Sequence, residues 1–256
     1  MMQRQVKLSI IVLTYNEEEI LEQALKTALF ADEIIIVDSN STDKSVEIAK
    51  KYTQNIFFNK FLDFSSQKNF ALSKAKHDWV YMLDADEVLS ENLQTEIIDT
   101  LNSNEEQCIA YRIKYAQFFM NRFLKYGTSG NDKIIRLMNK NYVKHEGLAH
   151  EKLILDGKCG DLKNKVFHYT YRGFNHYINK IDKTAWFKAR ELQEKNTIPN
   201  LFHFIIKPFY RFFHEYVIKR GFLDGIPGLI SASINSYGVF TRYVKLRILI
   251  KSTKKV

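Results

Sequence analysis

One apolar segment of the chain stops on two acids that lie one residue apart. Residues 79–83 are apolar, and Asp84, Ala85 and Asp86 follow at once. A strand that is apolar throughout is typical of a parallel α/β sheet covered on both faces. Such sheets bind ligands beyond the carboxyl ends of their strands, where carboxylates suit Mg²⁺ or Mn²⁺ and the phosphate oxygens that share it. The segment predicts an enzyme that handles a phosphorylated donor, unless the acids merely precede a helix capped by Ser90.

Strands and helices alternate through the first hundred residues. Apolar, β-branched segments predict strands, and apolar residues at helical spacing predict helices. The expected strands are 6–13, 33–37, 55–58 and 79–83, and the expected helices are 17–29, 44–52, 65–74 and 92–101. This order predicts an α/β fold, with a mostly parallel sheet flanked by helices.

The remainder of the chain has a different pattern. Segments 108–118, 133–138 and 152–155 predict further strands, and Asp156-Gly157 after the last of them predicts a hairpin turn. Segments 175–195 and 202–220 predict long helices, the second rich in aromatic residues. Residues 225–241 carry no charge, but Gly, Pro and polar residues interrupt them. We expect this segment to lie in an interface rather than to span a membrane.

Composition narrows the class of protein. The 256 residues, 45% of them hydrophobic, suffice for one sizeable core and a small appendage. The two cysteines, Cys108 and Cys159, make no disulfide framework and fit a reducing cytosol. The apolar stretch near the N-terminus is too short for a signal peptide, and there is no run of about eighteen apolar residues that would predict a spanning helix.

The positive charge is concentrated at the C-terminal end. The formal net charge is +9, and the residues from 200 onward hold ten Lys and Arg against Glu215 and Asp224. Mixed with aromatic residues, these cations predict contact with an anionic membrane surface. The alternative is a solvated helical face packed on the rest of the protein. No nucleic-acid partner is expected, because no nucleic-acid-binding motif is present.

Polar residues follow several of the predicted strands. Carboxyl ends of parallel strands share one edge, so we expect these groups to converge on one crevice. Lys68, in the third predicted helix, is expected to contribute to the same crevice. The polar groups after the strands are Thr14, Tyr15, Asn16, Glu17, Asp38, Asp84 and Asp86.

Three of these segments resemble the conserved blocks of family 2 glycosyltransferases. Those enzymes invert configuration, use nucleotide sugars and have the GT-A fold. The compact size and the later segment 143–153 look most like the lipopolysaccharide-core β-glucosyltransferase group. The three blocks are Ser9-Ile10-Ile11-Val12-Leu13-Thr14-Tyr15-Asn16-Glu17, Ile36-Val37-Asp38-Ser39-Asn40-Ser41-Thr42-Asp43 and Leu83-Asp84-Ala85-Asp86-Glu87.

The resemblance implies a role for each matching residue. Asp38 would bind the base, usually uracil, Asp86 would ligate the metal, and Asp84 would face the sugar nucleotide. The positive charge of the metal would stabilise the negative charge that develops on the departing diphosphate. The other residues implied to lie near the nucleotide are Thr14, Tyr15, Asn16, Glu17, Asn40 and Lys68.

Inversion also requires a base that deprotonates the acceptor hydroxyl. Many relatives use an Asp in a Glu-Asp pair, and this chain has no such pair after Asp86. It has His145-Glu146 and His150-Glu151 instead. We expect Glu151 to be the base, because a strand begins directly after it, with His150 orienting it or binding phosphate. Glu146 and Asp132 remain alternatives, and so does a purely structural role for either pair.

The sequence therefore predicts a GT-A enzyme in three parts. Residues 1–104 would form the nucleotide-sugar-binding half, 105–172 an acceptor-side sheet extension, and 173–256 a helical, basic, membrane-associated extension. It would transfer one hexose from a UDP-sugar, in the first instance UDP-glucose, to a membrane-associated acceptor such as lipopolysaccharide core. It would use Mg²⁺ or Mn²⁺ at the inner face of the cytoplasmic membrane. The Gln-x-x-Arg-Trp motif of processive synthases is absent, which favours transfer of a single sugar.

Two other readings of the sequence are weighed against this one. A nucleotidyltransferase would share the α/β scaffold, but it usually carries a Gly-rich, basic phosphate loop after its first strand, which Thr14-Tyr15-Asn16-Glu17 does not supply. A catalytically silent protein that binds a nucleotide sugar or a lipid is the second alternative, and the intact Asp84/Asp86 pair argues against it.

Overall fold

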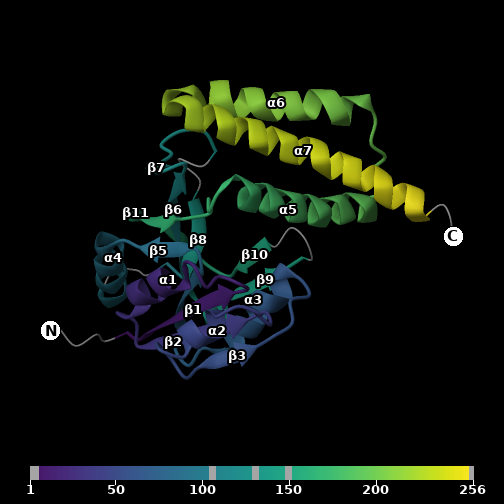
Figure 1. Ribbon diagram of the computed structural model, residues 1–256. Helices are drawn as coiled ribbons and strands as arrows, with labels where there is room; N and C mark the ends of the chain where they lie inside the picture. Colours follow the sequence, from purple (N-terminus) through teal and green to yellow (C-terminus); the bar gives the residue numbers. More distant parts are fainter. Residues whose placement is uncertain (1–5, 104–107, 129–132, 148–151, 254–256) are drawn as a thin grey trace. The chain divides into compact units, whose positions relative to one another are not determined.

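The structure is a computed structural model that describes residues 6–103, 108–128, 133–147 and 152–253 (Figure 1). Its contacts divide the chain into two units. Unit 1 consists of Met1–Tyr115 and Lys133–His168, and unit 2 consists of Ala116–Asp132 and Tyr169–Val256. The three-part division expected from the sequence stays a prediction.

Unit 1 is built on four parallel strands in the order β3-β2-β1-β4. All six residues of β2 are buried, as are six of the seven in β1. Burial on both faces explains why these strands are apolar throughout. The α/β fold predicted from the sequence is confirmed. The strands are β1 (Leu8–Thr14), β2 (Glu33–Asp38), β3 (Ile56–Phe58) and β4 (Trp79–Asp84), and the helices are α1 (Leu21–Ala28), α2 (Ser45–Ala49), α3 (Phe64–Lys74) and α4 (Glu91–Asn102).

Alternate residues of these strands enter two different cores. Ile10 and Val12 of β1 pack with Leu25 of α1 in the first core. Ile11, between them, packs with Ala71 of α3 in the second. Because successive side chains of a strand point to opposite faces, this two-sided packing fixes the register of the sheet.

Antiparallel strands extend the sheet beyond β4. β8 (Lys133–Asn139) pairs with β4, and β6 (Ala110–Phe119) pairs with β8. β11 (Cys159–His168) follows β6 in the sheet and pairs with the short strand β5 (Glu87–Leu89). The last pairing matters for function, because β5 begins directly after Asp86. The strand β7 (Arg122–Phe123) pairs with the end of β6.

The prediction of a hairpin turn at Asp156-Gly157 is wrong. β10 (Lys152–Leu155) pairs with β9 (Val143–Glu146), which follows the 3₁₀ turn Lys140–Tyr142, and these two strands form a separate sheet. Gly157 has φ +149 and leads the chain out of β10 into β11 of the main sheet. A turn sequence such as Asp156-Gly157 indicates that the chain changes direction. Which strand β10 pairs with depends on packing, and the turn sequence does not determine it.

Helices form most of unit 2. α7 (Gly225–Thr253) packs against both α5 (Phe174–Glu194) and α6 (Lys207–Phe213), and lies between them (Figure 1). The two long helices expected from the sequence are present. π-helical turns at Phe202–Ile206 and His214–Ile218 flank α6, and the 3₁₀ turn Gly221–Asp224 precedes α7.

The segment expected to be interrupted is one continuous helix, α7. Two of its glycines, Gly228 and Gly238, lie where another segment approaches closely. A Cβ added at Gly228 would lie 2.0 Å from the carbonyl oxygen of Gly221, and one added at Gly238 would lie 2.9 Å from Ile181 of α5. These glycines therefore permit close packing instead of ending the helix. None of the helices in the described ranges is long and apolar enough to cross a membrane.

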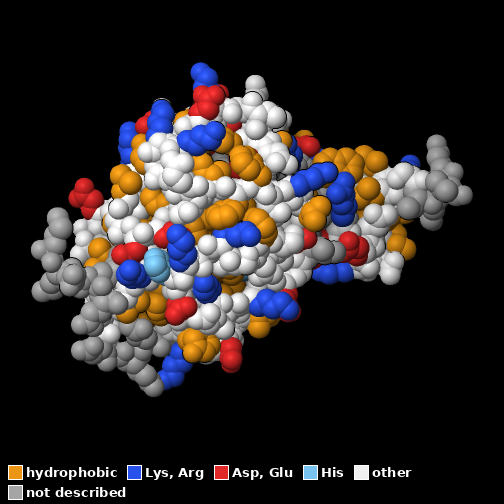
Figure 2. All heavy atoms as spheres, turned by 90° about the horizontal axis from the view of Figure 1, so that it is seen from below, with side chains coloured by type: hydrophobic (Ala, Val, Ile, Leu, Met, Phe, Trp, Pro, Cys, Tyr) orange, Lys and Arg blue, Asp and Glu red, His pale blue; other side chains and the backbone are white. Residues whose placement is uncertain are grey.

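Lysine and arginine side chains are spread over the face of the molecule in Figure 2, with hydrophobic side chains exposed between them. Charged and apolar side chains are therefore interspersed on this face.

Candidate active site

The carboxyl ends of β1, β2 and β4 lie at one edge of the sheet of unit 1. Leu13 of β1 is opposite both Val37 of β2 and Asp84 of β4, and Thr14 is opposite Asp38. The side chains that follow these strands therefore begin from neighbouring positions, as the sequence led us to expect. Ligands of α/β sheets bind at this kind of edge.

The loops after β1 and β2 are joined by reciprocal hydrogen bonds. The Asn16 amide donates to Ser41 Oγ at 2.9 Å, and the Thr42 amide donates to Asn16 Oδ1 at 2.7 Å. The Glu17 amide donates to Ser45 Oγ at 2.8 Å. Asn16 has φ 55, a left-handed conformation that asparagine tolerates better than most residues. Tyr15, which directly precedes Asn16, is 52% exposed.

Asp38 is fully buried at the end of β2, and Ser41 holds its carboxylate. The Ser41 amide donates to Oδ2 at 2.8 Å, and the Ser41 hydroxyl donates to Oδ1 at 2.5 Å. Asn40 lies in the turn between them with φ 64. A carboxylate can accept about four hydrogen bonds, and Ser41 donates two to Asp38. The Asp38 carboxylate can therefore accept further hydrogen bonds. That Asp38 binds a base stays a prediction.

Arg136 of β8 ties together the acids that follow β4. Its guanidinium pairs with Asp84 and with Glu87, and it donates to the Tyr115 hydroxyl at 3.0 Å. Arg136 and Glu87 are buried, whereas the Asp84 side chain is 38% exposed. The backbone amide of Asp84 also donates to Glu87 at 3.1 Å. One buried cation thus fixes the conformation of the strand end from which Asp84 and Asp86 extend.

The ionisation of this cluster follows from its burial and its charges. Burial raises the pKa of Glu87 to about 6, against the opposing effect of Arg136. Burial also acts to raise the pKa of Asp84, but Arg136 and then Lys68 outweigh it and lower the pKa below its usual value. Asp84 is therefore the member of the cluster that keeps its negative charge while facing solvent.

Asp86 lies next to a histidine from another strand. Its Oδ1 is 3.2 Å from Nε2 of His168, the last residue of β11, and the pairing of β11 with β5 sets His168 opposite Glu87. The His168 ring stacks on Tyr115 with 5.2 Å between centroids. Both side chains are largely buried, at 8% exposure for Asp86 and 20% for His168.

These two groups fit a divalent cation. Adjacent ligands of an octahedral ion with bonds of about 2.1 Å lie about 3.0 Å apart, close to the observed separation of the two atoms. Carboxylate and imidazole are both metal ligands, and the remaining positions of such an ion go to water and phosphate oxygens. Within the described part of the chain, no group of three or more His, Cys, Asp or Glu side chains is placed to hold a metal. Among the described residues, Asp86 and His168 are the pair that would hold such an ion.

The third predicted helix, α3, carries two further polar residues to this region. Lys68 acts electrostatically on Asp84 and lowers the pKa of its carboxyl group. Asn69 has a structural partner, since its side chain exchanges hydrogen bonds with the backbone of His145 at 2.7 and 3.0 Å. α3 thus anchors β9, the strand that precedes the candidate base.

The candidate bases are placed only in part. Glu146 is exposed and pairs with Lys144 at 3.0 Å, which makes it a surface ion pair. His145 is buried. His150, Glu151 and Asp132 lie outside the described residues.

Sequence reasoning missed two residues of the site. Arg136 is the one charged residue within Ile134-Ile135-Arg136-Leu137-Met138, and a cation in an otherwise apolar strand requires a buried partner. That signal was available. His168 carries no comparable signal, because only the pairing of β11 with β5 brings it to Asp86.

The parallel strands of unit 1 place Asp38 and Asp84 at one carboxyl edge, which is where α/β enzymes bind their ligands. The model of the family Glycosyl transferase family 2 matches residues 9–180, so the chain belongs to that family, and its fold is the GT-A fold expected from the resemblance. The nucleotidyltransferase alternative is therefore set aside.

Relatives extend over nearly the whole chain. An uncharacterized glycosyltransferase of Rickettsia bellii is 30% identical over 95% of this chain and 87% of its own length. The lipopolysaccharide core biosynthesis glycosyltransferase LpsC of Rhizobium meliloti is 22% identical over 92% of this chain and 93% of its own. Among solved structures, S. aureus TarS 1–349 in complex with UDP-GlcNAc has 15% identity and a TM-score of 0.48, covering 98% of this chain and 92% of that one.

Proposed function

We propose that the protein is an inverting hexosyltransferase that moves one sugar from a UDP-sugar, UDP-glucose in the first instance, to a lipid-linked acceptor such as lipopolysaccharide core. The observation that carries the proposal is the arrangement of Asp84, Asp86 and His168 at the strand edge. The acceptor is supported by the likeness to LpsC over nearly the full length of both chains.

Different residues of the strand edge would bind different parts of the donor. Asp38 and the joined loops around Asn16 and Asn40 would hold the nucleoside, with Tyr15 available to cover it. Lys68 would neutralise diphosphate charge, and Asp84, fixed by Arg136, would accept hydrogen bonds from the sugar. A carboxylate that is immobilised before the donor arrives loses less entropy on binding.

Asp86 and His168 would hold Mg²⁺ or Mn²⁺. When bound, the ion supplies positive charge that stabilises the departing diphosphate. Glu151 would take the proton of the acceptor hydroxyl, with His150 orienting its carboxylate. Donor binding and deprotonation of the acceptor would then depend on different segments of the chain. A substitution in one segment should therefore impair one of these functions and leave the other intact.

A stripe of apolar side chains on unit 2 would bring the enzyme to its acceptor. Phe202, Ile205, Phe209, Phe213 and Val217 are all exposed, at spacings of three or four residues that put them on one helix face. Exposed apolar stripes of this kind mark interaction sites. Exposed cations of the same unit that follow the stripe include Lys219, Arg220, Arg247 and Lys251. The combination suits an anionic bilayer at the inner face of the cytoplasmic membrane.

The experiment that tests the donor site is a thermal-shift series with UDP, GDP, CDP and their sugars, in Mn²⁺ or in EDTA. Ligands that bind only the folded protein raise its melting temperature with concentration. We expect a shift that requires both UDP and metal in the wild-type protein and is absent in Asp86→Ala. Equal shifts with all nucleotides, or shifts that EDTA does not change, would overturn the assignment.

A further inference from the structure

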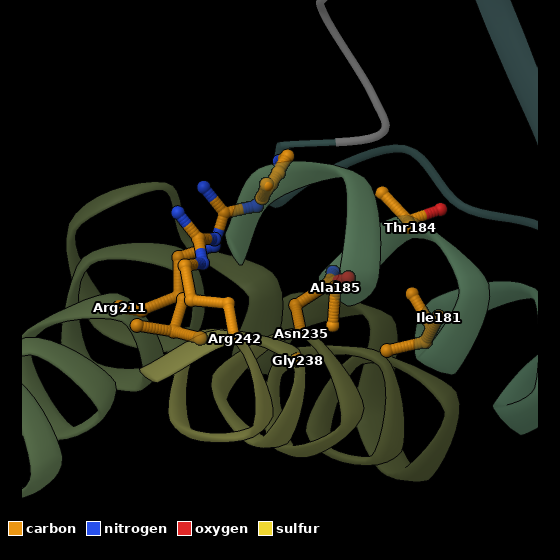
Figure 3. Close-up of a pocket in the computed structure, with 9 residues that line it drawn as sticks. Ile181, Thr184, Ala185, Arg211, Asn235, Gly238 and Arg242 are labelled. Carbon is orange, nitrogen blue, oxygen red and sulfur yellow. The ribbon is translucent and has the colours of Figure 1, made fainter. Parts of the chain in front are cut away.

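A small cavity lies inside the helical unit, and none of its lining residues has been given a functional role above. It has a volume of about 110 Å³, and α5, α6 and α7 all contribute to its walls (Figure 3). Each of these helices provides one cation: Lys188 from α5, Arg211 from α6 and Arg242 from α7. Figure 3 shows the Arg211 and Arg242 side chains lying next to each other with their nitrogen atoms at the same end.

The positive charge of this cavity is only partly balanced. Arg211 pairs with the buried carboxylate of Glu215 at 3.3 Å, and that carboxylate also accepts a hydrogen bond from Asn235 at 2.8 Å. Glu191 attracts both Lys188 and Arg242 electrostatically, but its carboxylate pairs with Lys195. Glu215 therefore balances Arg211 directly, and Glu191 divides its attraction among Lys188, Arg242 and Lys195.

The charged forms of Lys188 and Arg242 are disfavoured at their positions in the cavity wall. Burial, and then the charges of Arg242 and Arg211, lower the pKa of Lys188. Burial and the charge of Arg211 lower the pKa of Arg242, in spite of Tyr243 and Glu191. The Nε of Arg242 is buried and has no hydrogen-bond partner among the described residues. Buried polar groups are normally satisfied, so an orphaned guanidinium nitrogen beside a cavity points to a missing acceptor.

We propose that this cavity binds a phosphate group, held by Lys188, Arg211 and Arg242. Guanidinium groups match phosphate oxygens with paired hydrogen bonds, and a lysine adds a compact third charge. The site is separate from the donor site, since all its residues belong to unit 2 and the nucleotide residues belong to unit 1. The phosphate belongs either to a membrane lipid or to a soluble ligand.

The test compares two cavity variants, Lys188→Met and Arg242→Met, with Lys219→Met, which removes an exposed cation of the same unit. Melting temperatures are measured with pyrophosphate in EDTA, and sodium chloride keeps the ionic strength constant because screening alone relieves repulsion. Each lost charge-assisted contact should weaken pyrophosphate binding about tenfold or more. The Lys219→Met protein should respond as the wild type does.

A second arm identifies the source of the phosphate. Vesicles of phosphatidylcholine are compared with vesicles that also contain phosphatidic acid, whose phosphate is terminal. If the cavity variants lose both the pyrophosphate shift and the added binding to phosphatidic acid, the ligand is a lipid phosphate. If they lose the shift alone, it is a soluble one. The proposal is overturned if the cavity variants and Lys219→Met behave alike in both measurements.

The UDP and Mn²⁺ series on the same variants separates this site from the donor site. Cavity variants should retain the metal-dependent UDP shift. A protein that shows the pyrophosphate effect but no UDP shift would contradict the proposed function and leave the phosphate cavity standing, and the reverse result would do the opposite.

Discussion

Arg136 in the interior of β8 pairs with Asp84 at the end of β4, so the strand next to the parallel sheet fixes the first acid of the candidate site. The same guanidinium satisfies Glu87, which is fully buried. The conformation of the strand edge therefore depends on a residue more than fifty positions later in the chain. Arg136 therefore contributes both to the charge distribution of the candidate site and to the stability of unit 1.

Replacing Arg136 should destabilise the protein strongly. Arg136→Met leaves two carboxylates without their cation, and breaking a buried pair in this way costs about 3–5 kcal/mol. The matched control is Arg112→Met, whose partner Asp161 is 39% exposed, so its loss should cost about 1 kcal/mol or less. Urea denaturation measures both free energies of unfolding. Similar losses in the two variants would show that the Arg136 pairs contribute no more than a surface contact.

His168→Ala should weaken metal-dependent donor binding. Removal of residues that only orient a metal ligand costs about 10–100-fold in affinity, and removal of a ligand should cost at least as much. The dependence of the UDP-induced thermal shift on Mn²⁺ concentration measures the effect. His77→Ala, at a histidine that precedes the amino end of β4 and so lies at the opposite end of that strand from Asp84, is the control. An unchanged Mn²⁺ dependence in His168→Ala would remove His168 from the metal site.

Glu151→Gln should abolish transfer while donor binding stays intact, because the amide cannot accept the proton of the acceptor hydroxyl. Glu146→Gln is the control, since Glu146 forms an exposed ion pair with Lys144. Turnover with radiolabelled UDP-glucose and a lipid extract is measured alongside the thermal shift with UDP. Retained turnover in Glu151→Gln would move the base to Asp132 or, if Glu146→Gln is inactive, to Glu146.

Charges placed on the apolar stripe should release the protein from membranes. Phe209 and Phe213 are 66% and 42% exposed, and burial of one such side chain stabilises an association by about 1.5–3 kcal/mol. The double variant Phe209→Glu/Phe213→Glu should therefore bind anionic vesicles at least about tenfold more weakly in a sedimentation assay. Leu29→Glu changes a residue of unit 1 that is 60% exposed and should bind as the wild type does. Equal binding by all three proteins would contradict membrane association through this stripe.

The cavity cations should make stability depend on pH in a defined direction. Burial, Arg242 and Arg211 lower the pKa of Lys188 below 10.5, the value expected for an unfolded chain, against the attraction of Glu191. Between the two pKa values the unfolded state binds more protons, so the free energy of unfolding rises as the pH rises toward 10.5. Lys188→Met should be more stable than the wild type near pH 7, and this advantage should shrink as the pH rises toward 10.5. A constant difference from pH 7 to pH 10 would contradict it.

The sequence predicted the strand edge because its signals are local. An apolar run that ends on Asp84 reports both a buried strand and its carboxyl end, and parallel topology then forces Thr14, Asp38 and Asp84 to one edge. The same reasoning placed the helices of unit 1 and the long helices of unit 2. It failed at Asp156-Gly157 and at the glycines of α7, where packing partners decide whether a glycine turns the chain or lets two segments approach.

By itself, the sequence determined the family, the parallel core and the acids that follow its strands, because hydrophobic period and strand-end residues are properties of short segments. Only the tertiary structure decided that Arg136 holds Asp84, that His168 reaches Asp86, and that Lys245 and Lys207 are turned inward to Asp182 and Tyr243 instead of toward a membrane. These contacts join residues that are 36 to 82 positions apart, and their energies depend on burial and on distances between charges. No local pattern in the chain encodes either quantity.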